Sequence, residues 1–249
     1  FGTQLALSNL KARNASTALG LAWWVLNPLL LGAVYFLVFG IIFGDRRPDN
    51  FLGYLLAGIF PFNFTSTSMT GAINKIIGNA KLLVNVRFPR LILPLSAVFE
   101  ALFGFAASLV VLYAIVIPAG QLQGFPAIWL LPPVIVLQVM FNLGLGAAVA
   151  RLAVPFRDLN NLIPYLNRLW LYITPIIWPI SLLDDQEPWV RTLVYLNPLT
   201  SFVELYRAAL IGMPFDPNTL WVAAGWAVVV GVLGVGWFVR NEGHMVRYL

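Results

Sequence analysis

Long apolar stretches dominate this sequence and leave few ways for it to fold. A helix that crosses a membrane needs about 20 mostly apolar residues. The stretches of that length cover about residues 25–43, 51–71, 91–117, 128–150, 162–182 and 219–239. Only 10% of the 249 residues are charged, whereas a soluble domain carries roughly 25%. We therefore predict an all-α polytopic membrane protein with six transmembrane helices, and we exclude a soluble enzyme.

The charges between these stretches favour one orientation in the membrane. With the N-terminus inside, ten basic residues fall on the inner side and four on the outer side, which also holds seven of the ten acidic residues. Loops rich in Lys and Arg stay in the cytoplasm. Both termini are therefore predicted to be cytoplasmic. The net charge of +5 reflects this topology, and we expect no nucleic-acid partner.

Two polar segments outside the apolar stretches carry predictions of their own. Residues 1–20 mix Leu with Lys11 and Arg13, which favours an amphipathic helix along the inner membrane interface. Residues 184–217 hold apolar runs too short to span, broken by prolines, and we predict two short re-entrant helices there. Glu204 and Arg207 are three residues apart, so they can pair on one face of the second short helix.

Motifs for energy conversion and catalysis are missing. The sequence has no cysteine, a single histidine (His244) and no Gly-Lys-Ser/Thr of a P-loop. A metal centre, a nucleophilic triad and a nucleotide site are therefore not expected, and an energised task would need a separate subunit. We predict no catalytic, cofactor-binding or metal-binding residues in this chain.

Ionisable residues inside the apolar stretches are rare. Glu100 is the one acid within a predicted span, and Arg168 is the one clear base. Because a charge at that depth is costly, such residues are functional candidates. Glu100 could carry protons or meet a polar substrate, or it could bond to a neighbouring span. Arg168 could instead form an ion pair or extend its side chain to the membrane surface.

Short motifs follow one another along nearly the whole chain in a specific order. They are Lys11-Ala-Arg13, Leu19-Gly20-x-x-Trp23-x-x-x-Asn27-Pro28, Leu56-Ala57-Gly58, Pro61-Phe62-Asn63-Phe64, Asn79 with Leu82, Phe88-Pro89-Arg90-x-x-Leu93-Pro94-Leu95, Arg157-Asp158, Thr174-Pro175 with Pro179, Asn197-Pro198 and Glu204-x-x-Arg207. In order and spacing they resemble the permease subunits of ATP-binding-cassette polysaccharide exporters. That family includes the O-antigen, capsule and teichoic-acid export permeases.

The resemblance implies an assembly and a substrate. It implies a homodimer of six-span subunits in the bacterial plasma membrane, with two cytoplasmic nucleotide-binding ATPase subunits that bind ATP and Mg²⁺ in place of this chain. The family moves a polysaccharide linked to polyprenyl diphosphate from the inner to the outer leaflet. O-antigen, teichoic acid and a galactan precursor all stay open as the glycan.

The resemblance also assigns roles to basic residues on the inner side. The connector 74–86 is similar to the coupling helix that docks on the ATPase, with a second contact in the next inner loop; the residues concerned are Lys75, Asn79, Lys81, Arg157 and Asp158. A plain basic loop is the alternative for the connector, and mutual pairing is the alternative for Arg157 and Asp158. The candidates for meeting the lipid diphosphate are Arg87, Arg90, Lys11 and Arg13, because guanidinium groups match phosphate oxygens bidentately. Anchoring at the inner surface explains the same residues.

Aromatic side chains are the candidates for a glycan path, because their rings are apolar yet tolerate sugar. They are Tyr35, Phe39, Phe62, Phe64, Trp170, Tyr172 and Trp178. Packing within the bundle is the alternative for each of them. Gly40-x-x-x-Gly44 allows close helix approach, either at a dimer seam or within one subunit.

Three other functions remain open from the sequence. The same architecture could export a drug or a lipid. A membrane-embedded transferase acting on polyprenyl phosphate would need clustered acids or a histidine at one membrane face. A non-catalytic assembly subunit would lack an ATPase partner.

Overall fold

The computed structural model describes residues 23–35, 37–38, 50–80, 83, 88–120, 122, 124–156, 158–183 and 186–245. Within these ranges every regular element is a helix, which confirms the predicted all-α class. In chain order they are α2 (Trp23–Tyr35), α3 (Phe51–Gly78), α5 (Ile92–Val116), the short 3₁₀ helix η4 (Ile128–Leu130), α6 (Leu131–Ala153), α7 (Leu159–Ile173), the short 3₁₀ helix η5 (Ile180–Leu183), α8 (Pro188–Leu196), α9 (Pro198–Ile211) and α10 (Pro217–Met245).

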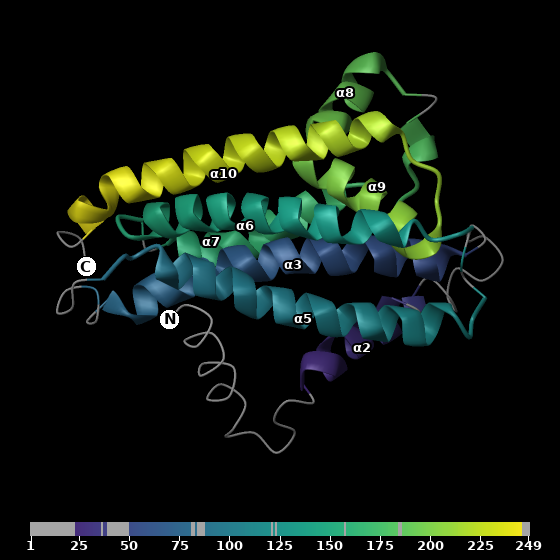
Figure 1. The fold of residues 1–249 in the computed structure, drawn as a ribbon, viewed down its shortest axis with the longest axis horizontal. Helices are drawn as coiled ribbons and strands as arrows, with labels where there is room; N and C mark the ends of the chain where they lie inside the picture. Colours follow the sequence, from purple (N-terminus) through teal and green to yellow (C-terminus); the bar gives the residue numbers. More distant parts are fainter. Residues whose placement is uncertain are drawn as a thin grey trace.

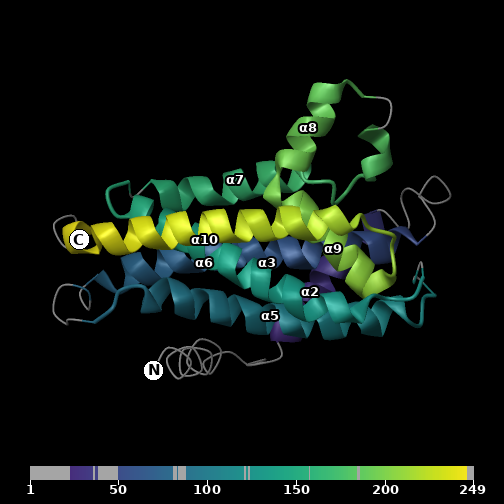
Figure 2. The same cartoon turned by 45° about the horizontal axis from the view of Figure 1, so that its top comes forward.

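The long helices form a bundle around α3. Figure 1 shows α3, α5, α6 and α10 lying side by side along the long axis of the molecule. α3 contacts α2, α5, α6, α7 and α9, and nearly all of its first half is buried. Figure 2 shows α8 projecting away from this bundle, next to the end where α10 begins. The centre of the molecule is therefore one helix, and the elements that build sites are grouped around it.

Three of the described helices are long and apolar enough to cross a membrane. They are Ile92–Val116, Ile128–Ala153 and Pro217–Gly243, and most residues in each apolar window face outward. They correspond to the predicted spans at 91–117, 128–150 and 219–239. α3 has 28 residues but carries Asn63 and a run of Thr and Ser at 65–68, which lower its hydropathy. The count of six spans stays a prediction, and the predicted interface helix at 1–20 lies outside the described residues.

Polar contacts join α6 to α3 in the middle of the bundle. The Gln138 side-chain nitrogen Nε2 donates to the Pro61 carbonyl oxygen at 2.8 Å and to the Thr65 hydroxyl at 3.0 Å. Both Gln138 and Thr65 are almost fully buried. Hydrogen bonds of this kind between apolar helices satisfy groups that would otherwise lie unpaired in hydrocarbon. They fix the register of α6 against α3.

Two predicted boundaries are wrong. α3 continues to Gly78, so residues 74–78 form its last turn rather than the start of a separate connector helix. α7 ends at Ile173, so no single helix covers 162–182. Thr174 has extended backbone (ψ 135°), the conformation that a following proline favours, and Pro175 follows it.

The segment 184–217 contains two short helices, as predicted, and its prolines mark where they begin. Pro188 and Pro198 occupy the first turns of α8 and α9, where a missing N–H costs no helical hydrogen bond. The Asn197 side-chain oxygen caps α9 by accepting from the Leu199 N–H at 3.2 Å. Gly212 ends α9 in the left-handed conformation (φ 78°), which glycine adopts without strain. α9 is thus capped at both ends, and all of its residues are buried except Pro198 and Glu204, which are partly exposed.

Arg207 on α9 holds three segments together near the start of α3. Its side chain is 3% exposed, and its Nε and Nη2 donate to the carbonyls of Tyr54 and Ile176, each at 3.2 Å. The guanidinium carbon lies 3.3 Å from the centroid of the Tyr54 ring. Gly58 leaves the room this needs, because a Cβ there would lie 3.1 Å from Nη2. α9 is thereby fixed to α3 and to the turn after α7.

The predicted pair between Glu204 and Arg207 is not a direct ion pair. The guanidinium turns toward the carbonyls of Tyr54 and Ile176, whereas a Glu204 carboxylate oxygen accepts from the Thr219 hydroxyl of α10 at 3.4 Å. Buried carbonyl groups need donors, and here they take up guanidinium N–H groups that an ion pair would use.

Glycines bring α6 and α10 into very close contact. A Cβ added at Gly144 would overlap the backbone of Val230 and Gly231, and one added at Gly234 would overlap the backbone of Gly144. Small residues at such a seam let helix backbones approach and pack. The α6–α10 contact is among the most extensive in the bundle, and it depends on these positions.

We expect Gly234→Ala to destabilise the protein, because its methyl group has no space between α10 and α6. Overpacking of this kind costs about 1–3 kcal/mol. Gly236→Ala is the matched control, since a Cβ there meets nothing within 4 Å and alanine favours a helix. Apparent Tm in detergent should fall for Gly234→Ala and hold or rise for Gly236→Ala. Equal Tm values for the two variants would contradict this packing.

We expect Arg207→Lys to destabilise the fold despite keeping the charge. A lysine ammonium cannot serve the two carbonyls with a planar fork while stacking on Tyr54, and each buried group left unpaired costs about 1–3 kcal/mol. Arg168→Lys is the control, because Arg168 is exposed on α7 and its guanidinium lies 5.8 Å from the Tyr165 ring centroid. Apparent Tm should fall clearly only for Arg207→Lys. A similar drop in both variants would refute the proposed role of the buried contacts.

Candidate functional site

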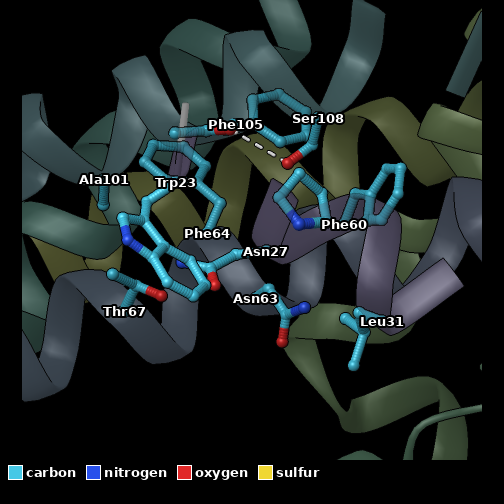
Figure 3. Close-up of a pocket in the computed structure, with 12 residues that line it drawn as sticks. Trp23, Asn27, Leu31, Phe60, Asn63, Phe64, Thr67, Ala101, Phe105 and Ser108 are labelled. Atoms are coloured by element: carbon cyan, nitrogen blue, oxygen red, sulfur yellow. Dashed lines mark hydrogen bonds between the residues drawn. The ribbon is translucent and has the colours of Figure 1, made fainter. Parts of the chain in front are cut away.

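A cavity of about 370 Å³ opens between α2, α3 and α5, and we call it the α2–α3–α5 pocket. Its lining combines aromatic rings with small polar side chains. The aromatic residues are Trp23, Phe60, Phe64 and Phe105, and the polar residues are Asn27, Asn63, Thr67 and Ser108. Figure 3 shows these side chains converging on one space from the three helices.

The wall of this pocket is held by ring packing. Phe64 of α3 stacks on Phe105 of α5, with centroids 5.3 Å apart and planes at 10°. Phe105 in turn meets the ring of Tyr206 on α9 edge to face at 5.4 Å. Aromatic pairs in these geometries add stability beyond their buried area. The pocket wall is therefore in direct ring contact with α9.

Among its described residues the pocket offers hydrogen-bonding groups without charge. The described residues that line it include no acid, base or thiol. Two amide side chains, Asn27 and Asn63, offer both donors and acceptors, while the Ser108 hydroxyl donates to the Gly104 carbonyl at 2.9 Å. Uncharged hydrogen-bonding groups beside aromatic faces suit a ligand that is partly polar and partly apolar.

The described members of the predicted glycan-path set do not line a single cavity. Phe64 lines the α2–α3–α5 pocket, whereas Phe62 is buried in the hydrophobic core. Tyr172 is 64% exposed on α7. The side chain of Tyr35 and the whole of Phe39 lie outside the described residues.

Trp170 joins α7 to the start of α9, and Trp178 bonds the turn after α7 back to α7. The Trp170 indole N–H donates to the Asn197 side-chain oxygen at 2.8 Å, and the Asn197 amide donates to the Thr174 hydroxyl at 2.8 Å. The Trp178 indole N–H donates to the Tyr172 carbonyl at 3.0 Å. The motifs Thr174-Pro175 and Asn197-Pro198 therefore have a structural role, because the side chains of Thr174 and Asn197 hold the end of α7 against the start of α9.

Sequence reasoning missed most of the pocket lining. Trp23 entered only as part of a family motif, and Phe105 and Ser108 lie in an apolar run without a distinguishing pattern. Asn27 and Asn63 carried a usable signal, because side-chain amides within apolar spans need partners. Which helices bring those amides to one space depends on the packing of α2 and α5 against α3.

Lys75 and Glu100 form an ion pair between α3 and α5. Their side chains are 15% and 13% exposed, and Lys75 also donates to the Ser96 hydroxyl at 2.9 Å. Of the interpretations left open for Glu100, the structure shows a bond to a neighbouring helix. Lys75, predicted to dock on an ATPase, is instead directed into the bundle, because the nearby carboxylate and hydroxyl satisfy its ammonium group.

The other predicted coupling residues are only partly described. The Asn79 side chain donates to the Lys75 carbonyl at 2.7 Å and so closes the last turn of α3. Asp158 is exposed just before α7. Lys81 and Arg157 lie outside the described residues.

Arg90 is the one described member of the set predicted to meet a lipid diphosphate. It precedes α5 and donates through Nη1 to the Glu242 carbonyl near the end of α10. A cation is favoured there, because the last carbonyls of a helix carry partial negative charge. Arg87, Lys11 and Arg13 lie outside the described residues.

A metal centre finds no support in the described part of the chain. Among those residues no group of three or more His, Cys, Asp or Glu side chains could hold a metal ion.

Comparison with known proteins gives a consistent result. Residues 4–211 match the ABC-2 type transporter family. The O-antigen export system permease protein RfbA of Myxococcus xanthus is 35% identical over 205 residues, which cover 82% of this chain and 77% of the relative. An RfbA protein of Klebsiella pneumoniae is 26% identical over 97% of this chain and 92% of the relative.

A third relative has a different name. The polysialic acid transport protein KpsM of Escherichia coli is 26% identical over 246 residues, with 97% of this chain and 93% of the relative covered. The family match extends over most of the sequence, from before α2 to the end of α9. The chain therefore belongs to the ABC-2 type transporter family.

Proposed function

We propose that this chain is the permease subunit of an ATP-driven exporter that moves a polysaccharide across the bacterial plasma membrane. The observation that carries the proposal is the match to exporters of O-antigen and polysialic acid over most of the chain. The α2–α3–α5 pocket adds support, because uncharged amides beside aromatic rings suit a glycan. The substrate is a polysaccharide linked to polyprenyl diphosphate, moved from the inner to the outer leaflet.

The assembly we propose is a homodimer of this chain with two ATPase subunits. The sequence has no P-loop motif, and a nucleotide site therefore comes from the partner, which binds ATP and Mg²⁺. The connector that follows α3, with Asn79 and Lys81, docks on that partner together with Arg157 and Asp158. Lys75 contributes indirectly, because its pair with Glu100 holds the last turn of α3 against α5.

The topology we propose has six spans, formed by α2, α3, α5, α6, α7 and α10, with both termini in the cytoplasm. Its support is the charge at the two ends of the bundle. Lys75, Arg90 and Arg151 lie at the end where α3 finishes and α5 begins. Glu204 and Asp216 lie at the opposite end. Basic residues at the cytoplasmic surface fit this orientation, and Arg90 with Arg87, Lys11 and Arg13 can then meet the diphosphate of the carrier.

The first test is purification of the chain from native membranes in mild detergent. We expect a stoichiometric P-loop ATPase to copurify, and its ATP hydrolysis to rise when lipid-linked glycan is added. A clean preparation without a nucleotide-binding partner would overturn the exporter and favour an assembly subunit or a transferase. Stimulation by drugs or free lipids, but not by glycan carriers, would favour the rival exporters.

We expect charge reversal at Lys81 or Arg157 to uncouple ATP hydrolysis from export. Lys81→Glu or Arg157→Glu should lower ATP-dependent glycan export roughly tenfold, the scale of about 1.4 kcal/mol, while hydrolysis by the complex continues. The matched control is Arg240→Glu, the same kind of charge change at an exposed position on α10. Both rates are measured in proteoliposomes. Normal export by the two test variants would remove these residues from the coupling contact.

A further inference from the structure

A second cavity lies at the end of the bundle opposite to the Lys75–Glu100 pair. It has a volume of about 420 Å³ and is bounded by the start of α3, by α8 and α9, and by the residues that lead into α10. We call it the α9–α10 cavity. Its size falls in the range of about 300–1,000 Å³ that small-molecule sites occupy, and it is separate from the α2–α3–α5 pocket.

Two carboxylates line this cavity with few partners of their own. Glu204 accepts a single described hydrogen bond, from the Thr219 hydroxyl at the long distance of 3.4 Å. Asp216 accepts from the Asn218 backbone N–H at 2.9 Å. An ionised carboxylate has about four acceptor positions, so both groups have capacity left for a ligand that donates hydrogen bonds.

Arg207 provides donors in the same cavity. Its bonds to the carbonyls of Tyr54 and Ile176 use two of its N–H groups, and it also forms a hydrogen bond with the Tyr54 side chain, so about two of the five N–H groups that a guanidinium carries stay unused. The side chain is 3% exposed, so the unused donors are shielded from bulk water. A ligand in the cavity that accepts hydrogen bonds would therefore meet a fixed, buried cation.

Burial shifts the pKa values of Glu204 and Arg207 on α9, which is too short to span a membrane. Burial raises the pKa of the Glu204 carboxyl, while the Thr219 hydrogen bond and the charge of Arg207 offset part of that rise. Burial lowers the pKa of Arg207 to about 10, so the guanidinium stays charged at neutral pH.

The mixture of groups selects the ligand chemistry. A phosphate is an anion with mostly acceptor oxygens and would be repelled by the carboxylates, whereas an ammonium only donates hydrogen bonds and would be repelled by Arg207. A hydroxyl both donates and accepts, so it suits a wall that holds both kinds of partner. Phe215 and Met213 provide apolar surface in the same cavity, which fits the C–H face of a sugar ring.

We propose that the α9–α10 cavity is a saccharide-binding subsite that takes a sugar residue of the exported glycan through its hydroxyl groups. Glu204 and Asp216 accept hydrogen bonds from the sugar, and Arg207 donates to it. The origin of the sugar in the exported glycan rests on the proposed function. The ability of the cavity to bind a sugar rests on the residues that line the cavity. In the proposed topology the cavity lies at the outer end, where a glycan would leave.

The test uses the full permease–ATPase complex in lipid nanodiscs. Saturation-transfer NMR is recorded with methyl glycosides of galactose, rhamnose, mannose and N-acetylglucosamine as probes. We expect transfer to at least one glycoside, and we expect Glu204→Leu to weaken glycoside binding roughly tenfold, because the change removes a charged acceptor of sugar hydroxyls. Glu187→Leu is the matched control, because Glu187 is exposed and does not line the cavity.

A second variant keeps the test sound if Glu204→Leu folds poorly. Asn218 is exposed at the rim of the cavity, and only its backbone N–H bonds to Asp216. Asn218→Trp should therefore block the cavity and abolish glycoside binding while the apparent Tm is kept. Unchanged glycoside binding in this variant would overturn the subsite, as would displacement of the glycoside by inorganic phosphate or methylammonium.

Export of lipid-linked glycan by the same preparations separates this inference from the proposed function. If the wild-type complex exports glycan but shows no glycoside binding that depends on Glu204, the subsite is overturned and the proposed exporter function still stands. A wild-type complex that binds a glycoside through Glu204 but exports no glycan supports the saccharide site and overturns the proposed function.

Discussion

The guanidinium of Arg207 joins α9 to the first turn of α3, 153 residues earlier in the chain. It is buried, and its partners are two backbone carbonyls and the Tyr54 ring rather than a carboxylate. A planar fork of donors can satisfy this arrangement, whereas a lysine ammonium cannot. The positions of α9, of the turn after α7 and of the α9–α10 cavity all follow from this contact.

α3 is also held by other helices along the rest of its length. At one end it receives Arg207, in its middle it accepts the Gln138 side chain of α6, and at its other end Lys75 pairs with Glu100 of α5. The α2–α3–α5 pocket is built on the same helix, between these fixed points. In the proposed exporter, the connector that meets the ATPase continues directly from α3. A force on the connector would therefore act on a helix that is held by neighbouring helices at its start, in its middle and at its end.

Periodicity and composition predicted the parts of the structure that depend on local chemistry. The all-α class, the long apolar helices at 92–116, 128–153 and 217–243, and the two short helices of 184–217 followed from hydropathy and from proline positions. The end of α7 was missed, although Thr174-Pro175 marked it. The ion pair of Lys75 was also missed. Lys75 lies in the expected connector, and the sequence gives no sign that it pairs with a carboxylate 25 residues later.

The sequence by itself determined that the chain is a helical membrane protein of the ABC-2 type, because hydropathy and motif order are properties of the linear chain. Only the tertiary structure decided which side chains share a cavity. Asn27, Asn63 and Ser108 come from three helices, and Glu204, Arg207 and Asp216 face one space only after α9 is fixed against α3 and α10. Such groupings depend on how helices pack, and packing is set by contacts between residues far apart in the sequence.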